Sequence, residues 1–196
     1  MSEKEKLVQM IREQQGVITT KMVTAQGFSR RVLSELEEEQ LISRVERGIY
    51  VMDSGCVDQY FLLQYRFPQG VFSHETALYL LGYLDQAPQQ IQMTFPLGFN
   101  TFRTKEAKVQ AIIASKDVTI GSISLQRSGG TTLQVYEIER TLIDLLKPRY
   151  KADKVLLMSA LKQYIRSDAC NIAKLNDYAQ LFKLETKVQP YLEVLL

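Results

Sequence analysis

The stretch TTKMVTAQGFSRRVLSELEEEQLISRVERGIY, residues 19–50, places two adjacent arginines directly after a Gly-Phe-Ser sequence. Ser29 is a favoured helix N-cap residue, so a helix is predicted to begin at Arg30. The apolar residues that follow recur at the spacing of one buried helix face: Val32, Leu33 and Leu36. The stretch therefore predicts a short amphipathic helix that carries Arg30 and Arg31 in its first turn.

Two further helices are predicted before this one, and a hairpin after it. Apolar residues at helical spacing predict an amphipathic helix that ends before Gly16. A second short helix fits residues 20–26, with Thr19 or Thr20 as its N-cap. Residues 41–52 alternate apolar and polar types around an Arg-Gly pair, which predicts two short strands joined by a tight turn. Three helices followed by a hairpin, in this order, predict a winged helix-turn-helix.

A winged helix-turn-helix points to nucleic acid as the partner. The third helix of such a module enters the major groove with its N-terminal residues, where free amides and the helix dipole also favour phosphate. Hairpin arginines are placed to reach phosphates or the minor groove, and a lysine at the start of the second helix suits a backbone contact. The predicted contacts to double-stranded DNA are Lys21, Ser29, Arg30, Arg31, Ser34, Arg44 and Arg47.

Four glutamates follow the two arginines within eight residues. In a groove-binding helix they would occupy the C-terminal part, pointing away from the DNA and repelling DNA that lay along the whole helix. Arg31 and Glu35 are also four residues apart, which fits an ion pair along one helix face. The alternative is an ordinary solvated helix, with the hairpin arginines as a solvated loop that protects an edge strand.

Composition limits the class of protein. The chain has 196 residues and 45% hydrophobic content, which excludes a disordered protein and allows one large core or two small ones. The net charge is only +2, and residues 1–55 contain eight basic and nine acidic side chains. Basic residues are therefore concentrated rather than abundant, and this module alone should bind DNA with modest affinity.

Cysteine usage and the N-terminus suggest a cytoplasmic location. Cys56 and Cys170 lie far apart without metal-like spacing, and the first residues lack an apolar core of signal-peptide length. No run approaches the roughly 20 apolar residues of a membrane helix. The sequence therefore predicts reduced thiols, no metal site, no cofactor and no membrane segment.

The second part of the chain predicts a domain of mixed α/β type with several strands and C-terminal helices, so that the fold class is α+β. The predicted boundaries are a winged helix-turn-helix over residues 1–55 and a second domain over 56–196. Helices are predicted at 57–67, 73–84, 139–146, 152–165, 172–182 and 186–195, and strands at 90–95, 108–115, 119–126 and 132–138.

No pattern in the second domain predicts catalysis. His74 is the only histidine, and a nucleophile-base pair with Ser73 is one interpretation. The favoured one is that Ser73 caps a helix, Glu75 complements its dipole and His74 is a polar residue of the first turn. Arg140 and Asp144, four residues apart, fit a helix salt bridge. The sequence therefore predicts no catalytic residue and no enzyme.

Two further stretches contain glycines or basic residues that could suggest a binding site. Residues 127–132, RSGGTT, lack a P-loop lysine and a strand-to-helix setting, so a hairpin turn is predicted there. A basic cluster surrounds Pro148 and is either a solvated face or a secondary contact with DNA or an acidic partner. Its members are Lys147, Arg149, Lys151 and Lys154.

Three stretches taken together resemble a known family. VERGIYV at 45–51, FSHETALYLLGYLD at 72–85 and YEIERTLIDLL at 136–146 are similar in order and spacing to the AbiEi antitoxins of AbiE abortive-infection systems. The resemblance extends from the winged helix through the third stretch and is weakest after about Lys151. It implies a type IV antitoxin, part of a toxin-antitoxin system in phage resistance.

The resemblance also implies partners. Such antitoxins repress their own operon by binding inverted repeats, and they counter a nucleotidyltransferase-like toxin without requiring a stable complex with it. Neutralisation in the family is attributed to the C-terminal domain. The alternative for this chain is a winged helix used as a protein-interaction module, with no operator.

Overall fold

The chain forms two compact units in a computed structural model that describes residues 2–14, 16–52, 58–127 and 131–195. The first unit lies within Met1–Arg66 and Gln126–Thr132, and the second within Phe67–Leu125 and Leu133–Leu196. Both contain helices and a sheet, so the predicted α+β class is confirmed. The predicted boundary between Gly55 and Cys56, and the glycines of the predicted turn at 127–132, lie outside the described residues.

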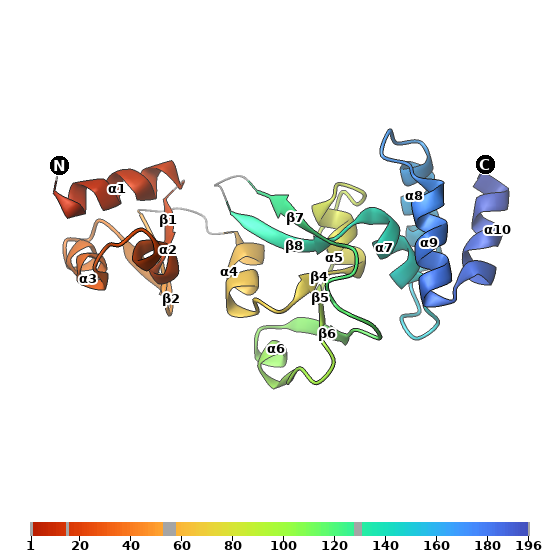
Figure 1. Cartoon of the computed structure of the whole chain (residues 1–196), viewed down its shortest axis with the longest axis horizontal. Coiled ribbons are helices and arrows are strands. Elements are labelled where there is room, and N and C mark those ends of the chain that lie inside the picture. The colour runs from red at the N-terminus through yellow and green to blue at the C-terminus, as the bar shows by residue number, and fades with distance from the viewer. Residues whose placement is uncertain (1, 15, 53–57, 128–130, 196) are drawn as a thin grey trace. The chain divides into compact units, whose positions relative to one another are not determined.

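Among its described residues, the first unit contains four helices and a three-stranded antiparallel sheet. These elements are drawn in red to yellow-orange in Figure 1. The predicted order of three helices and a hairpin is present, and a fourth helix follows. The helices are α1 (Glu3–Glu13), α2 (Thr20–Ala25), α3 (Arg30–Glu38) and α4 (Gln59–Arg66). The strands, in spatial order, are β1 (Val17–Thr19), β3 (Ile49–Val51) and β2 (Ser43–Glu46).

Side-chain caps fix where these helices begin. The hydroxyl of Ser2 accepts from the Glu5 amide at 3.2 Å while the Glu5 carboxylate accepts from the Ser2 amide, which completes a capping box. Thr19, rather than Thr20, caps α2 by accepting from the Met22 amide at 3.2 Å. Ser29 caps α3 as predicted, with its hydroxyl 3.2 Å from the Arg31 amide. Each cap satisfies an amide that has no partner within its helix.

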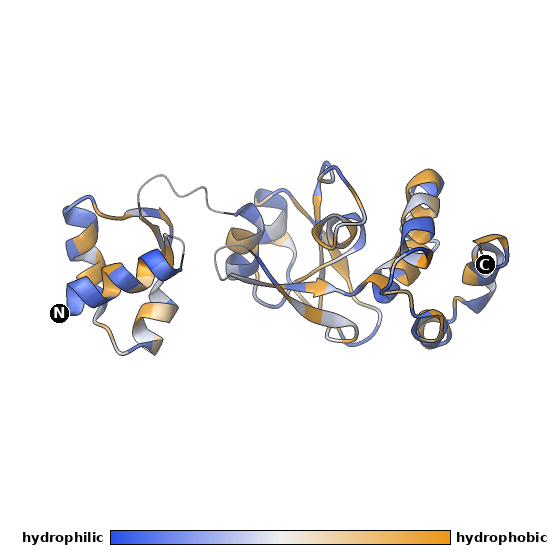
Figure 2. Ribbon diagram, turned by 90° about the horizontal axis from the view of Figure 1, so that it is seen from above, coloured by the Kyte–Doolittle hydropathy of each residue, from blue (hydrophilic) through white to orange (hydrophobic). Residues whose placement is uncertain are grey.

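The core of the first unit is built from the apolar faces of these short elements. Along α1, hydrophilic and hydrophobic residues alternate around the helix (Figure 2). Strand β1 was not predicted, because three residues are too few to show alternation; it pairs with β3 and makes that strand central. One cluster of buried residues in this core consists of Leu7, Ile11, Ile18, Val23, Val32, Leu33, Leu36 and Ile42.

The second unit contains a five-stranded mixed sheet. Strand β4 lies at its centre, antiparallel to β5 and parallel to β8, while β5 runs parallel to β6. The four predicted strands are confirmed, and β4 is additional because two residues leave no pattern. In spatial order the strands are β6 (Val109–Ile113), β5 (Ile91–Phe95), β4 (Val71–Phe72), β8 (Thr132–Tyr136) and β7 (Ser122–Gln126).

Six helices accompany this sheet. Every residue of α7 is buried, and it packs with α5, α8 and α9. The prediction that α5 reaches Leu84 was wrong, because the helix ends before Gly82, which adopts a left-handed backbone (φ +83°). The helices are α5 (His74–Leu80), α6 (Phe102–Glu106), α7 (Ile138–Leu145), α8 (Lys154–Ile165), α9 (Ile172–Phe182) and α10 (Glu185–Leu195).

None of the helices within the described residues is both long enough and apolar enough to cross a membrane. The short helix α6 was not predicted, since five residues do not establish a helical period.

Candidate functional site

A hollow on the first unit lies between the start of α3 and the hairpin formed by β2 and β3. It is called the arginine hollow below. Three arginines and four hydroxyl-bearing side chains line it, and none of the described residues in its lining is acidic. The lining residues are Thr20, Arg30, Leu33, Ser34, Arg44, Arg47, Gly48, Tyr50 and Tyr65.

The rotation of α3 determines which side chains face the arginine hollow. Because Val32, Leu33 and Leu36 turn into the core, Arg30 and Ser34, four residues apart, share an exposed face. Arg31 lies on the neighbouring face, where its Nε is 3.0 Å from Oε1 of Glu35. The predicted pairing of Arg31 with Glu35 is therefore confirmed.

Two of the four glutamates after the arginines, Glu35 and Glu39, and Glu3 of α1 form contacts within the first unit. The Glu39 carboxylate pairs with Lys4 of α1, and Glu3 of α1 accepts from the Ser29 amide at 2.8 Å. Together with the Arg31–Glu35 pair, these ion pairs and hydrogen bonds compensate part of the negative charge around α3. The arginine hollow itself stays free of carboxylates among the residues described.

The hairpin is held to α2 at its turn. Gly48 adopts a left-handed backbone (φ +84°), and its carbonyl accepts from the Thr20 amide at 2.9 Å. The register of β2 against β3 shifts between Arg44 and Glu46, and Arg44 Nε donates to the Glu46 carbonyl at 3.2 Å. A bulge of this kind re-aims side chains at a sheet edge. The arrangement brings Arg44 and Arg47 to the same hollow as Arg30.

Of the seven residues predicted from the sequence, the structure gathers four in the arginine hollow. These are Arg30, Ser34, Arg44 and Arg47. Lys21 is exposed on α2, Ser29 is committed to its cap, and Arg31 faces away in its ion pair. Sequence reasoning missed Thr20, Tyr50 and Tyr65, since a lone hydroxyl gives no local signal of its neighbours.

The basic cluster of the second unit is split by its surroundings. Lys147 forms an ion pair with Asp144 and lies 4.1 Å from the centre of the Phe182 ring, and burial lowers its pKa. Arg149 is exposed and reaches the Ile113 carbonyl with Nη2 at 3.3 Å. Lys151 and Lys154 are exposed. Three of the four side chains are therefore open to an external partner, while Lys147 has an internal one.

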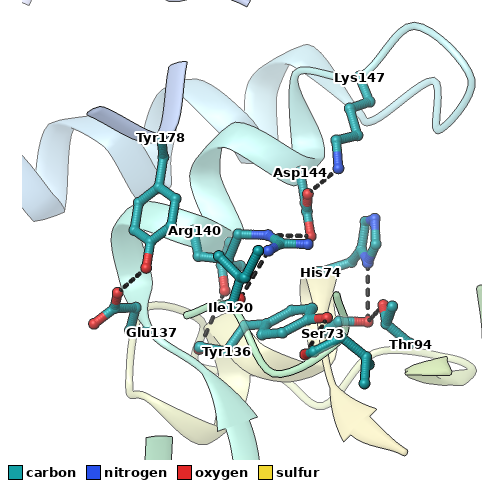
Figure 3. A network of polar contacts seen from close by, with 12 residues as sticks. Ser73, His74, Thr94, Ile120, Tyr136, Glu137, Arg140, Asp144, Lys147 and Tyr178 are labelled. Atoms are coloured by element: carbon teal, nitrogen blue, oxygen red, sulfur yellow. Dashed lines mark hydrogen bonds and ion pairs between the residues drawn. The ribbon is translucent and has the colours of Figure 1, made fainter. Parts of the chain in front are cut away.

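A buried polar network lies where two central strands of the second unit end (Figure 3). Strands β4 and β8 are parallel, so Ser73 and His74, after β4, lie at the same sheet edge as Tyr136, the last residue of β8. The Thr94 hydroxyl donates to that of Ser73 at 2.8 Å, and Ser73 Oγ is 3.0 Å from Nδ1 of His74.

This network corrects the favoured interpretation of Ser73. Ser73 occupies the N-cap position of α5, but its hydroxyl makes no cap bond and is bonded inside the network instead. His74 is the first residue of α5, as interpreted, and its side chain is buried: it is 3% exposed with a left-handed backbone (φ +54°). Burial lowers the pKa of His74 to about 4, which keeps the ring neutral at pH 7. The pair is present, but both side chains are closed to a substrate arriving from solvent.

The predicted salt bridge between Arg140 and Asp144 is also part of this network (Figure 3). Nε of Arg140 is 3.0 Å from Oδ2 of Asp144, and Nη1 donates to the Ile120 carbonyl at 2.8 Å. The guanidinium lies 4.4 Å from the centre of the Tyr136 ring and 4.2 Å from that of Phe182. The two aromatic rings and the Ile120 carbonyl therefore stabilise the buried Arg140 guanidinium in place of water.

A comparison with protein families finds a match within the first unit. Residues 5–52 match a family described as "Transcriptional regulator, AbiEi antitoxin". This match shows a similarity to the AbiEi antitoxin family over the helix-turn-helix region. The matched residues include most of α1, all of α2 and α3, and the hairpin, so the matched region contains all three arginines of the hollow. The resemblance found in the sequence is confirmed over residues 5–52, which include the stretch at 45–51, whereas the stretches at 72–85 and 136–146 lie outside the match.

The fold extends beyond the AbiEi match. A solved structure, that of the RV2827C protein from Mycobacterium tuberculosis, is similar with a TM-score of 0.56 and 16% sequence identity. The similarity covers 91% of this chain and 71% of that one, and at this identity it shows the fold alone. Among curated proteins, none matches the sequence significantly.

Proposed function

We propose that this AbiEi-type chain is a transcriptional autorepressor that binds double-stranded DNA through the arginine hollow. The observation that carries the proposal is the convergence of Arg30 from α3 with Arg44 and Arg47 from the hairpin. In a winged helix-turn-helix, these are the two elements that face DNA, one in the major groove and one on the backbone. The expected operator contains inverted repeats in the chain's own promoter, as the family resemblance implies.

The charge of the hollow supports a polyanion as its partner. Three guanidinium groups face a surface without described carboxylates, although the first 55 residues carry a net charge of minus one. Each phosphate contact adds about 0.9 to the slope of log affinity against log salt. Three such contacts predict a modest, salt-sensitive affinity. Secondary contacts from Arg149, Lys151 and Lys154 would raise it.

Binding to the promoter is tested by fluorescence anisotropy with the upstream duplex and a scrambled duplex of equal length. Full-length protein should prefer the upstream duplex, and Arg30→Ala should weaken binding. Arg12→Ala is the matched control, since Arg12 is an exposed arginine of α1 outside the hollow. Equal affinity for both duplexes would leave the first unit as a protein-interaction module without an operator.

The second function proposed is that of a type IV antitoxin in phage resistance. The second domain, beginning near Cys56, counters a nucleotidyltransferase-like toxin without a stable complex. This proposal is supported by the resemblance of residues 72–85 and 136–146 to the AbiEi antitoxins, and these stretches form α5 and α7 around the buried network. Since α7 is completely buried, it would stabilise the second domain from inside. Other, exposed faces of that domain would then contact the toxin or its target.

Separation of the two activities tests this division. A fragment of residues 56–196 keeps every element of the second unit and is long enough to bury its own core. It should fold, fail to bind the promoter duplex, and still relieve growth arrest when expressed with the toxin. Circular dichroism and cooperative melting check its folding. A folded fragment without rescue at matched expression would assign part of the antitoxin activity to the first unit.

A further inference from the structure

Tyr65 lines the arginine hollow although it lies outside the region matched to the AbiEi family. That region ends at residue 52, whereas Tyr65 belongs to α4, which is part of the same compact unit. Its side chain is half-buried and shares the hollow with the guanidinium groups of α3 and the hairpin. The lining of the hollow therefore extends beyond the helix-turn-helix and the hairpin.

The hydroxyl of Tyr65 lies at the turn of the hairpin. It donates to the Gly48 carbonyl at 3.4 Å, while the Thr20 amide donates to the same oxygen at 2.9 Å. Bonds between hydroxyl donors and oxygen acceptors are typically about 2.7 to 2.8 Å long. The Gly48 carbonyl thus has a good donor in Thr20, and the hydroxyl of Tyr65 is only weakly committed to it.

A larger residue at the same turn would crowd two side-chain hydroxyls. A Cβ atom at position 48 would lie 2.8 Å from the Tyr65 hydroxyl and 3.3 Å from Oγ1 of Thr20. The left-handed backbone of Gly48 adds to this restriction. Close approach of the turn to α4 therefore brings a neutral donor, the Tyr65 hydroxyl, beside the three guanidinium groups.

We infer that the Tyr65 hydroxyl is a DNA ligand, which donates to a backbone phosphate seated in the arginine hollow. The inference rests on the proposed DNA binding. A phosphodiester accepts hydrogen bonds and carries negative charge, and the hollow offers guanidinium and hydroxyl donors from α2, α3, the hairpin and α4. Tyrosine hydroxyls are common donors to phosphate in protein–DNA complexes.

A direct contact of Tyr65 with phosphate and a role in positioning the hairpin predict different salt dependences of DNA affinity. A neutral donor that contacts phosphate releases no counterion, so its loss lowers affinity without changing the salt dependence. If Tyr65 instead held Arg44 and Arg47 in place through Gly48, its loss would also remove charged contacts. The slope of log affinity against log salt would then fall.

The experiment compares full-length wild type with Tyr65→Phe, binding the promoter duplex from about 50 to 300 mM salt. The substitution keeps the ring and removes only the hydroxyl, so the fold is retained, which circular dichroism checks. We expect affinity to fall about three- to tenfold at every salt concentration, with the wild-type slope unchanged. Tyr191→Phe is the matched control, because Tyr191 is a half-buried tyrosine of α10 in the second unit and should leave affinity unchanged.

Three results would overturn the assignment. Unchanged affinity in Tyr65→Phe would show that the hydroxyl does not contact DNA. A loss of affinity together with a slope lower by about one would make Tyr65 a positioning residue for the hairpin arginines. Wild-type protein that binds no promoter duplex would refute the proposed function and this assignment together, whereas either of the first two results refutes the assignment alone.

Discussion

Two ion pairs with the same geometry should contribute differently to the free energy of unfolding, because one is exposed and the other is buried. Arg31–Glu35 and Arg140–Asp144 both join residues four apart on a helix, and both have an Nε to carboxylate oxygen distance of 3.0 Å. The first pair is 85% and 43% exposed in its side chains, the second only 1% and 3%. The same geometry is therefore present once in water and once in the core.

The perturbation is to neutralise each carboxylate with its amide analogue. Asp144→Asn leaves the buried Arg140 without a counter-ion and removes the ion pair of Lys147, so unfolding should become easier by about 3 to 5 kcal/mol. The rings of Tyr136 and Phe182 still contact the guanidinium in this variant and limit the loss of stability. Glu35→Gln should cost no more than about 0.5 kcal/mol, because water screens the exposed pair.

The assay is chemical denaturation of the full chain. The sequence has ten tyrosines and no tryptophan, so near-UV circular dichroism of the tyrosines follows tertiary structure. The two units need not unfold together, and the relevant transition is that of the second unit for Asp144→Asn and of the first for Glu35→Gln. The double variant Arg140→Met/Asp144→Leu should be less destabilised than Asp144→Asn, since it removes both buried charges.

Equal costs of the two single substitutions, within about 0.5 kcal/mol, would contradict the effect of burial. A double variant destabilised by the sum of Arg140→Met and Asp144→Leu, measured separately, would also contradict it, because coupling between the charges would then be absent.

Four further predictions concern His74, Arg30, Arg44 and the hairpin turn. Because burial lowers the pKa of His74 from 6.5 to about 4, the unfolded chain binds its proton more readily between these values, and stability should fall as pH drops through this window. The free energy of unfolding should be measured by denaturation at pH 4 to 7 for wild type and His74→Asn. Its decrease between pH 7 and pH 4 should be smaller in the variant by up to about 3 kcal/mol. Arg30→Ala should weaken promoter binding by about 1 to 3 kcal/mol if it reads a base edge, and more than Arg31→Ala, as anisotropy titrations would show. Arg44→Ala should lower the salt slope by about one, and equal slopes for variant and wild type would count against it as a phosphate ligand. Gly48→Ala should destabilise the first unit by about 1 kcal/mol or more, measured by thermal melting, and a neutral effect would contradict the strain at this turn.

The sequence by itself determined the elements whose signals are local. The cap at Ser29, the stripe of α3 and the alternation around Gly48 predicted the helix and hairpin that carry Arg30, Arg44 and Arg47. Helices α8 to α10 were predicted near their observed bounds for the same reason, since ten or more residues establish a helical period. Capping and periodicity depend on neighbours a few positions away, so they are visible in one dimension.

Only the tertiary structure decided the roles that depend on distant neighbours. The sequence presents Arg31–Glu35 and Arg140–Asp144 with the same spacing, and only packing shows that one pair lies in water and the other in the core. The hydroxyl of Ser73 leaves its predicted cap because Thr94, 21 residues away, donates to it. Tyr65 reaches the arginine hollow through a contact with Gly48, 17 residues earlier. Desolvation and hydrogen bonding are set by whatever the fold brings within a few ångströms, and the order of residues does not reveal that.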